Sequence, residues 1–201
     1  MKIKCAGLVA LAASTASGDV NLEFRPEAGV IGVGQAARVG LYATWDGSGA
    51  GQTVSAIELV FSWDTGYLSL TGLDGTGGAS LITSDFPLTG SGGLNESAPP
   101  GDGDGLYRAF AMLGTPIDVS VPGGALITTF LFQGLAETPA TPVDILASGG
   151  SPEVFTRVFD GTVPNTVVTG TLTGTTITIV PAPGAGVLLL TAAFAARRRR
   201  R

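Results

Sequence analysis

The chain has 201 residues, 44% of them hydrophobic, with 11 lysines and arginines against 16 aspartates and glutamates. It contains no histidine and one cysteine, which excludes a Ser–His–Asp or Cys–His catalytic arrangement and a zinc centre built from several such ligands. The acidic balance also argues against nucleic-acid binding, because phosphate backbones are held by clustered positive charge.

The N-terminus has the layout of a secretory signal peptide. A basic start at Lys2 and Lys4 is followed by the short apolar segment 5–13 and by small residues that end at Ala16. This order predicts export and cleavage after Ala16, so that residues 1–16 form a signal peptide. Cys5 precedes most of the apolar segment, so we expect it to be removed with the signal rather than lipidated.

Residues 17–179 have the size of one domain and a strongly acidic surface. Between the two ends of the chain lie four arginines and all 16 acidic residues, a net charge of −12. About 160 residues can bury a substantial hydrophobic core within a single domain. A surface of this charge repels nucleic acid and anionic lipid and attracts cations.

Short β-rich segments separated by turn residues recur through this domain. Residues 57–63 show the strongest alternation, with Ile57, Leu59, Phe61 and Trp63 on one face. The pattern predicts an all-β, antiparallel β-sandwich of the jelly-roll type with about nine strands, and an edge strand near residues 80–86 inside the long connection 72–100. The predicted strands are residues 20–24, 37–44, 57–63, 68–70, 106–112, 126–132, 143–146, 154–159, 167–171 and 175–180.

Three segments carry a family resemblance. Residues 30–43 hold a glycine turn before a strand, residues 57–70 an alternating strand that ends in Trp63-Asp64, and residues 123–130 a late apolar strand. Their order resembles a cohesin-like domain, a β-sandwich related to bacterial carbohydrate-binding modules. The resemblance implies non-catalytic binding of a dockerin partner, and it supplies no motif from which contact residues could be assigned.

Two local features offer alternative interpretations. Asp102 and Asp104 alternate with glycines on a turn, which suits either a calcium site or a solvated turn, since calcium prefers several oxygen ligands. Trp63 ends an alternating apolar face and is predicted to lie in the core, whereas Trp45 lies at a strand end and could contact a sugar. Paired carboxylates could also serve a glycosidase, but 16 acids on one domain provide chance pairs.

The C-terminus reads as a sorting tail, residues 180–201. It begins with the proline motif Val180, Pro181, Ala182 and Pro183, continues with about 13 mainly apolar residues, and ends with the basic cluster Arg197, Arg198, Arg199, Arg200 and Arg201. As a helix the apolar run would cover only ~20 Å, less than the ~20 residues that cross a bilayer comfortably. We therefore expect a short hydrophobic helix that halts transiently in a membrane, with the arginines on the cytoplasmic side.

This three-part layout resembles the PEP-CTERM sorting signal of bacteria, with alanine at the usual glutamate position of the proline motif. The resemblance implies processing by an exosortase-type enzyme; an ordinary tail anchor is the alternative.

Together these features predict an exported, non-catalytic protein that is membrane-associated as a precursor and then lies at the cell surface or in the extracellular matrix. Its domain would serve adhesion or protein interaction without a cofactor. The alternative is a carbohydrate-binding module acting on exopolysaccharide or, less favoured, a glycan-active enzyme.

Overall fold

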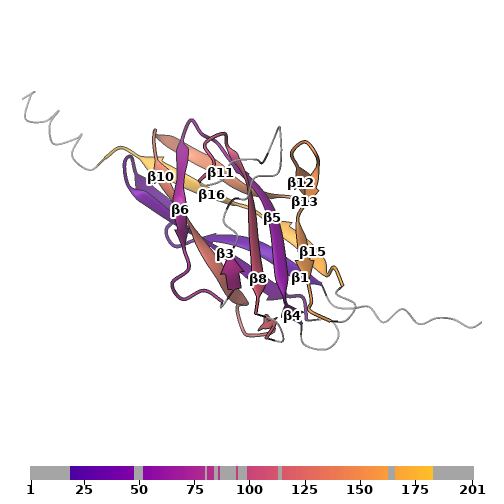
Figure 1. Ribbon diagram of the computed structural model, residues 1–201. Helices are drawn as coiled ribbons and strands as arrows, with labels where there is room; N and C mark the ends of the chain where they lie inside the picture. Colours follow the sequence, from indigo (N-terminus) through magenta and orange to yellow (C-terminus); the bar gives the residue numbers. More distant parts are fainter. Residues whose placement is uncertain are drawn as a thin grey trace, which may run out of the picture.

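The computed structural model describes residues 19–47, 52–79, 81–83, 86, 94, 99–112, 115–162 and 166–182 (Figure 1). These residues form strands and turns without a helix, in two packed sheets, as the sequence predicted. The predicted signal peptide, the apolar segment of the tail and its arginines lie outside the described residues. Among the residues described, no helix is long and apolar enough to cross a membrane.

Sheet A consists of β1 (Val20–Pro26), β3 (Ala36–Trp45), β6 (Leu68–Asp74), β10 (Ala125–Gly134) and β15 (Thr169–Thr173). Their spatial order is β15-β1-β3-β10-β6, with the two ten-residue strands β3 and β10 side by side. Along β1 and β3, buried side chains mostly alternate with half-buried or exposed ones, because one face of this sheet packs on the core and the other faces solvent. In the central strand β10, four consecutive residues, 127–130, are buried.

Sheet B consists of β2 (Val30–Gly32), β5 (Ala56–Trp63), β7 (Leu81–Thr83), β8 (Asp104–Ala111), β11 (Thr138–Leu146), β14 (Arg157–Phe159) and β16 (Thr175–Val180). Its order is β2-β16-β11-β5-β8-β7, and β14 pairs with the first half of β5. Strand β7 lies at the edge of the sheet, which confirms the edge strand expected within the long connection. Two small pairs complete the fold: β4 (Thr53–Val54) with β9 (Ile117–Asp118), and β12 (Ser148–Gly149) with β13 (Val154–Phe155).

The described residues contain 16 strands rather than about nine, although nine of them have five residues or more. The additional strands are two or three residues long, too short for alternation to reveal them. The segment predicted as one strand over residues 154–159 is interrupted at Thr156. The hydroxyl of Thr156 accepts a hydrogen bond from the Val60 amide and donates one to the Leu146 carbonyl, so a side chain replaces the backbone pairing there.

The sandwich is not purely antiparallel, which corrects the sequence-based expectation. Strand β15 pairs in parallel with β1, and β16 pairs in parallel with β2. Strands β15 and β16 follow one another along the chain but belong to different sheets, and the chain passes from sheet A to sheet B at Gly174. A Cβ atom at Gly174 would lie 2.6 Å from the Asp144 carboxylate, so only glycine fits this crossing without a shift.

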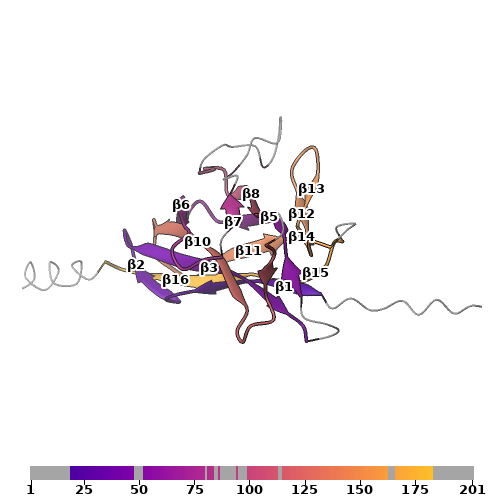
Figure 2. The ribbon, with the colours of Figure 1, turned by 60° about the horizontal axis from the view of Figure 1, so that its bottom comes forward.

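The hydrophobic core fills the space between the sheets, and aromatic rings occupy its centre. Phe61 is fully buried, and its ring centroid lies 4.8 Å from that of Phe130 and 5.6 Å from that of Trp63. Trp63 is 6% exposed, as its place in the alternating pattern predicted. The hairpin formed by β12 and β13 projects from the body of the sandwich (Figure 2).

Gly124 allows the loop before β10 to approach β3 closely, so replacing Gly124 should destabilise the fold more than replacing its neighbour Gly123. Gly123 and Gly124 both have φ near +80°, but a Cβ at Gly124 would lie 2.6 Å from the Ala43 carbonyl oxygen, whereas one at Gly123 meets nothing within 4 Å. Gly123→Ala should cost about 1–2 kcal/mol through backbone strain alone. Gly124→Ala should cost at least ~1 kcal/mol more through overpacking. Urea unfolding measures both, and equal losses would show that the close contact is absent.

Candidate interaction surface

The residues predicted to form the sorting motif lie at the end of the fold. Val180 is the last residue of β16, where it pairs with Gly32 and accepts a hydrogen bond from the Val33 amide at 3.0 Å. Pro181 and Ala182 follow it and are exposed. Pro183 and residues 197–201 lie outside the described residues. Strand β1 begins and β16 ends at opposite ends of the sandwich (Figure 1).

The two aspartates of the suggested calcium site, Asp102 and Asp104, differ in how far they are exposed to solvent. Asp102 is exposed in a bend, whereas Asp104 is the first residue of β8, half-buried and paired with Ser62. Between them Gly103 has φ +97°, and its carbonyl accepts the Trp63 amide at 2.8 Å. Within the part of the chain that the structure describes, no three His, Cys, Asp or Glu side chains are grouped to hold a metal. Calcium binding at Asp102 and Asp104 stays a prediction.

The outer face of sheet B carries an apolar row, exposed at its two ends and half-buried between them, that the sequence patterns did not reveal. Ala56 pairs with Phe110 on one side and with Phe159 on the other, and Phe159 forms a bridge to Val167. We call Phe110, Ala56, Phe159 and Val167 the apolar row. Phe110 is 42% exposed and Val167 51% exposed. Their neighbours Ala109, Val158 and Val168 are buried in the core, so the members of the row point to the outer face.

A charged row lies beside the apolar row, two residues further along the same strands. Glu58 of β5 pairs with Arg108 of β8 and with Arg157 of β14. Arg108 Nε donates to the Glu58 carboxylate at 2.8 Å, whereas the Arg157 guanidinium lies over the Phe155 ring at 5.2 Å. The row thus holds two cations around one carboxylate and contains half of the four arginines in the acidic domain.

A third row on the same face is covered. Val60 pairs with Leu106 and Leu146, and Val60 and Leu106 are buried in a second, small hydrophobic cluster with Leu94. Val154 of the projecting hairpin packs against this cluster. On the outer face of sheet B, this third row is therefore covered by other residues, whereas the charged row and the apolar row are at least partly exposed to solvent.

Comparison with solved structures identifies the architecture. A cohesin module of a family 33 glycoside hydrolase from Clostridium perfringens aligns with a TM-score of 0.57 at 13% identity, covering 83% of this chain and 100% of the module. The fold is cohesin-like. A type II cohesin domain from the cellulosome of Acetivibrio cellulolyticus gives 0.52 at 12% identity (79% and 95% covered), and a type I cohesin–dockerin complex from Clostridium thermocellum gives 0.50 at 10% identity (80% and 99%). No family model matches the chain, and no curated protein matches it.

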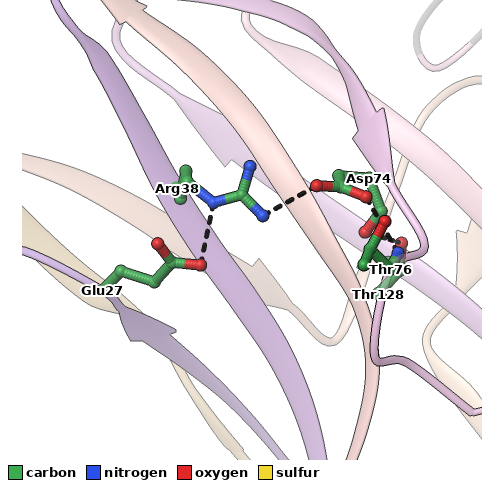
Figure 3. Close-up of polar contacts among 5 residues, drawn as sticks. All are labelled: Glu27, Arg38, Asp74, Thr76 and Thr128. Atoms are coloured by element: carbon green, nitrogen blue, oxygen red, sulfur yellow. Dashed lines mark hydrogen bonds and ion pairs between the residues drawn. The ribbon is translucent and has the colours of Figure 1, made fainter.

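The outer face of the cohesin-like sandwich's other sheet is crossed by a charge network (Figure 3). Arg38 of β3 donates at 2.8 Å both to the Glu27 carboxylate and to the Asp74 carboxylate at the end of β6. Asp74 also accepts the Thr76 amide at 2.8 Å. Hydrogen bonds from Thr76 and Arg38 lower the pKa of Asp74 from 3.8 to about 2. The network ties together chain segments that are 11 and 36 residues from Arg38.

The shift at Asp74 predicts how acid weakens the cohesin-like sandwich. Because the folded-state pKa is below the unfolded value, ionised Asp74 stabilises the fold above pH ~4, and this contribution is lost as the pH falls towards ~2. Asp74→Asn should therefore reduce the free energy of unfolding at pH 6 but change it little at pH 2. Because the Arg38–Asp74 ion pair is only partly buried, high salt should shrink the difference at pH 6. A loss of equal size at both pH values would contradict this assignment.

Proposed function

We propose that this chain is an exported, non-catalytic surface or extracellular-matrix protein whose cohesin-like sandwich binds a protein partner through the apolar row. The observation that carries the proposal is the exposure of Phe110 and Val167 beside the charged row. Contiguous exposed apolar side chains on a soluble domain mark interaction sites. Aromatic and arginine side chains are enriched at protein interfaces, where they dominate the binding energy.

The chemistry of this face suits a protein rather than a polyanion. Glu58 offsets one of the two arginines in the charged row, and the domain as a whole has a net charge of −12. Desolvation of the two phenylalanines would supply affinity, and the charged row would set the orientation of the partner. The similarity to a module seen in a cohesin–dockerin complex supports a protein partner of this general kind.

The ends of the chain support export and processing. We infer a precursor with a signal peptide at residues 1–16, an ectodomain at 17–179 and a PEP-CTERM-like tail at 180–201 that is cut by an exosortase-type enzyme. The strand register separates the start of the tail from the apolar row, because β16 pairs with β11 near Thr138 while the apolar row crosses β5 at Ala56. About twelve residue steps separate these positions, on the order of 40 Å along the strands. A molecule held by its tail would present the row away from the membrane.

Position-specific crosslinking in the producing cells tests the protein partner. Phe110 is replaced in the intact chain by the photoreactive analogue benzoylphenylalanine. The matched control carries the same replacement at Leu135, which is 45% exposed and lies outside the apolar row. We expect one discrete protein adduct from position 110, its loss when Phe159→Ser is added, and no adduct from position 135. Adducts of equal yield from both positions, or none from position 110, would refute the proposed surface.

A further inference from the structure

A cavity of about 390 Å³ lies where β3 ends and β10 begins, and its lining includes no residue of the apolar row. It is bounded by Arg25 of β1, by Thr44 and Trp45 of β3, and by the loop 119–124 that precedes β10. Its volume falls within the ~300–1,000 Å³ range of small-ligand pockets. The walls combine an aromatic ring, a guanidinium group and hydroxyl groups.

Trp45 supplies the aromatic wall. It is the last residue of β3 and pairs with Val20 at the start of β1. The indole packs partly against the hydrophobic core and also lines the cavity, so its position is held by the sandwich rather than by a loop. The electron-rich face of an indole attracts the weakly positive C–H groups of a pyranose ring. An aromatic wall of this kind therefore favours uncharged ligands that can stack on it.

Arg25 is held in place as a hydrogen-bond donor. Its Nη1 donates to the Gly123 carbonyl at 2.7 Å, its Nη2 to the Glu23 carboxylate at 2.8 Å, and its guanidinium lies 4.4 Å from the centre of the Tyr42 ring. These bonds use two of the five N–H donors of the group. Because these contacts already orient the Arg25 guanidinium, a ligand hydroxyl could accept a hydrogen bond from its remaining N–H donors with little further loss of side-chain entropy.

Hydroxyl groups complete the polar lining. Thr44 of β3 and Ser120 of the loop are the lining residues that carry a hydroxyl group. The Ser120 hydroxyl donates to the Asp118 carboxylate at 2.6 Å, which leaves its lone pairs able to accept. A ligand that both donates and accepts hydrogen bonds through hydroxyl groups matches this set.

The charges around the cavity select against anions. Glu23 already pairs with Arg25, and that hydrogen bond lowers the pKa of Glu23, so the carboxylate is ionised at neutral pH. Asp46 directly follows Trp45, and Asp118 bonds to the loop. With three carboxylates near one guanidinium, an acidic sugar would be repelled. We propose that this cavity binds a neutral sugar residue of an extracellular polysaccharide. The assignment does not depend on the protein-partner surface, because the two sites share no residue.

Tryptophan fluorescence tests the sugar site. The chain has two tryptophans, so Trp63→Phe leaves Trp45 as the single reporter. The full-length variant, purified in lauryldimethylamine oxide to avoid sugar headgroups, is titrated with cellohexaose, maltohexaose, laminarihexaose and chitohexaose, and with oligogalacturonate as the acidic probe. At least one neutral oligosaccharide should give a saturable change below about 10 mM, a weak but measurable affinity, and oligogalacturonate should give none. A response to oligogalacturonate alone, or to no probe, overturns the proposal.

Paired arginine variants locate the binding. Arg25→Ala should weaken the binding of the neutral oligosaccharide at least about tenfold, which corresponds to ~1.4 kcal/mol. Arg38→Ala is the matched control, because Arg38 is an equally exposed, ion-paired arginine on the same face of sheet A and does not line the cavity. Urea unfolding of each variant confirms that it is folded. Unchanged binding in Arg25→Ala would place the sugar elsewhere. Phe110→Ser should leave sugar binding intact, which separates this result from the test of the protein partner.

Discussion

Replacing Phe61 by alanine should lower the free energy of unfolding by about 3–5 kcal/mol, the range for removal of a buried phenylalanine. The Phe61 ring is fully buried, and its centroid lies within 6.3 Å of those of Phe24, Phe86 and Phe130. These rings come from both sheets and from the connection between β7 and β8. Phe24 and Phe130 are held by strands and cannot collapse into the space, so the loss should fall towards the upper part of this range.

Phe110→Ala is the matched control for this substitution. Phe110 lies in the same sheet but on its outer face, 42% exposed, so its replacement should cost less than about 1 kcal/mol. Urea unfolding of the two variants and the parent compares the losses directly. Because a one-residue change of register exchanges the two faces of a strand, a larger loss in Phe110→Ala than in Phe61→Ala would show that the inward face is misassigned.

Removing the terminal arginines should abolish processing of the precursor. If the tail is a sorting signal, the protein should enter the membrane first and later appear at the surface, shortened by about the residues that follow the proline motif. Replacing residues 197–201 by serine removes the charge that opposes complete translocation. The precursor should then cross the membrane and be released at full length, without the tail being cut.

Changing the proline motif should have the opposite effect. Pro181→Ala with Pro183→Ala leaves the apolar segment and the arginines intact, so the unprocessed precursor should stay in the membrane fraction. Fractionation followed by intact-mass measurement distinguishes the two variants. A parent protein recovered from the surface still ending at Arg201 would identify the tail as a permanent anchor.

Local pattern was enough to predict the fold class and the inward face of its main strands. The alternation from Ile57 to Trp63 depends only on the two-residue period of a strand, and all four apolar members of that pattern lie in the core. The short connection strand near residue 82 was also predictable, since a β-rich segment between glycine and serine stretches has the composition of an edge. Trp63 was assigned to the core on the same ground.

Strand register and sheet closure were decided by the tertiary structure. Phe110 and Phe159 are 49 positions apart, and they flank Ala56 only because β8 and β14 pair with β5 in one particular register. Trp45 meets the loop 119–124 because β3 and β10 are neighbours, and the parallel pairing of β15 with β1 closes the sandwich. Periodicity describes a residue's own strand and carries no information about which distant strand lies beside it. Surfaces assembled from several strands therefore become visible only once long-range packing has fixed their order.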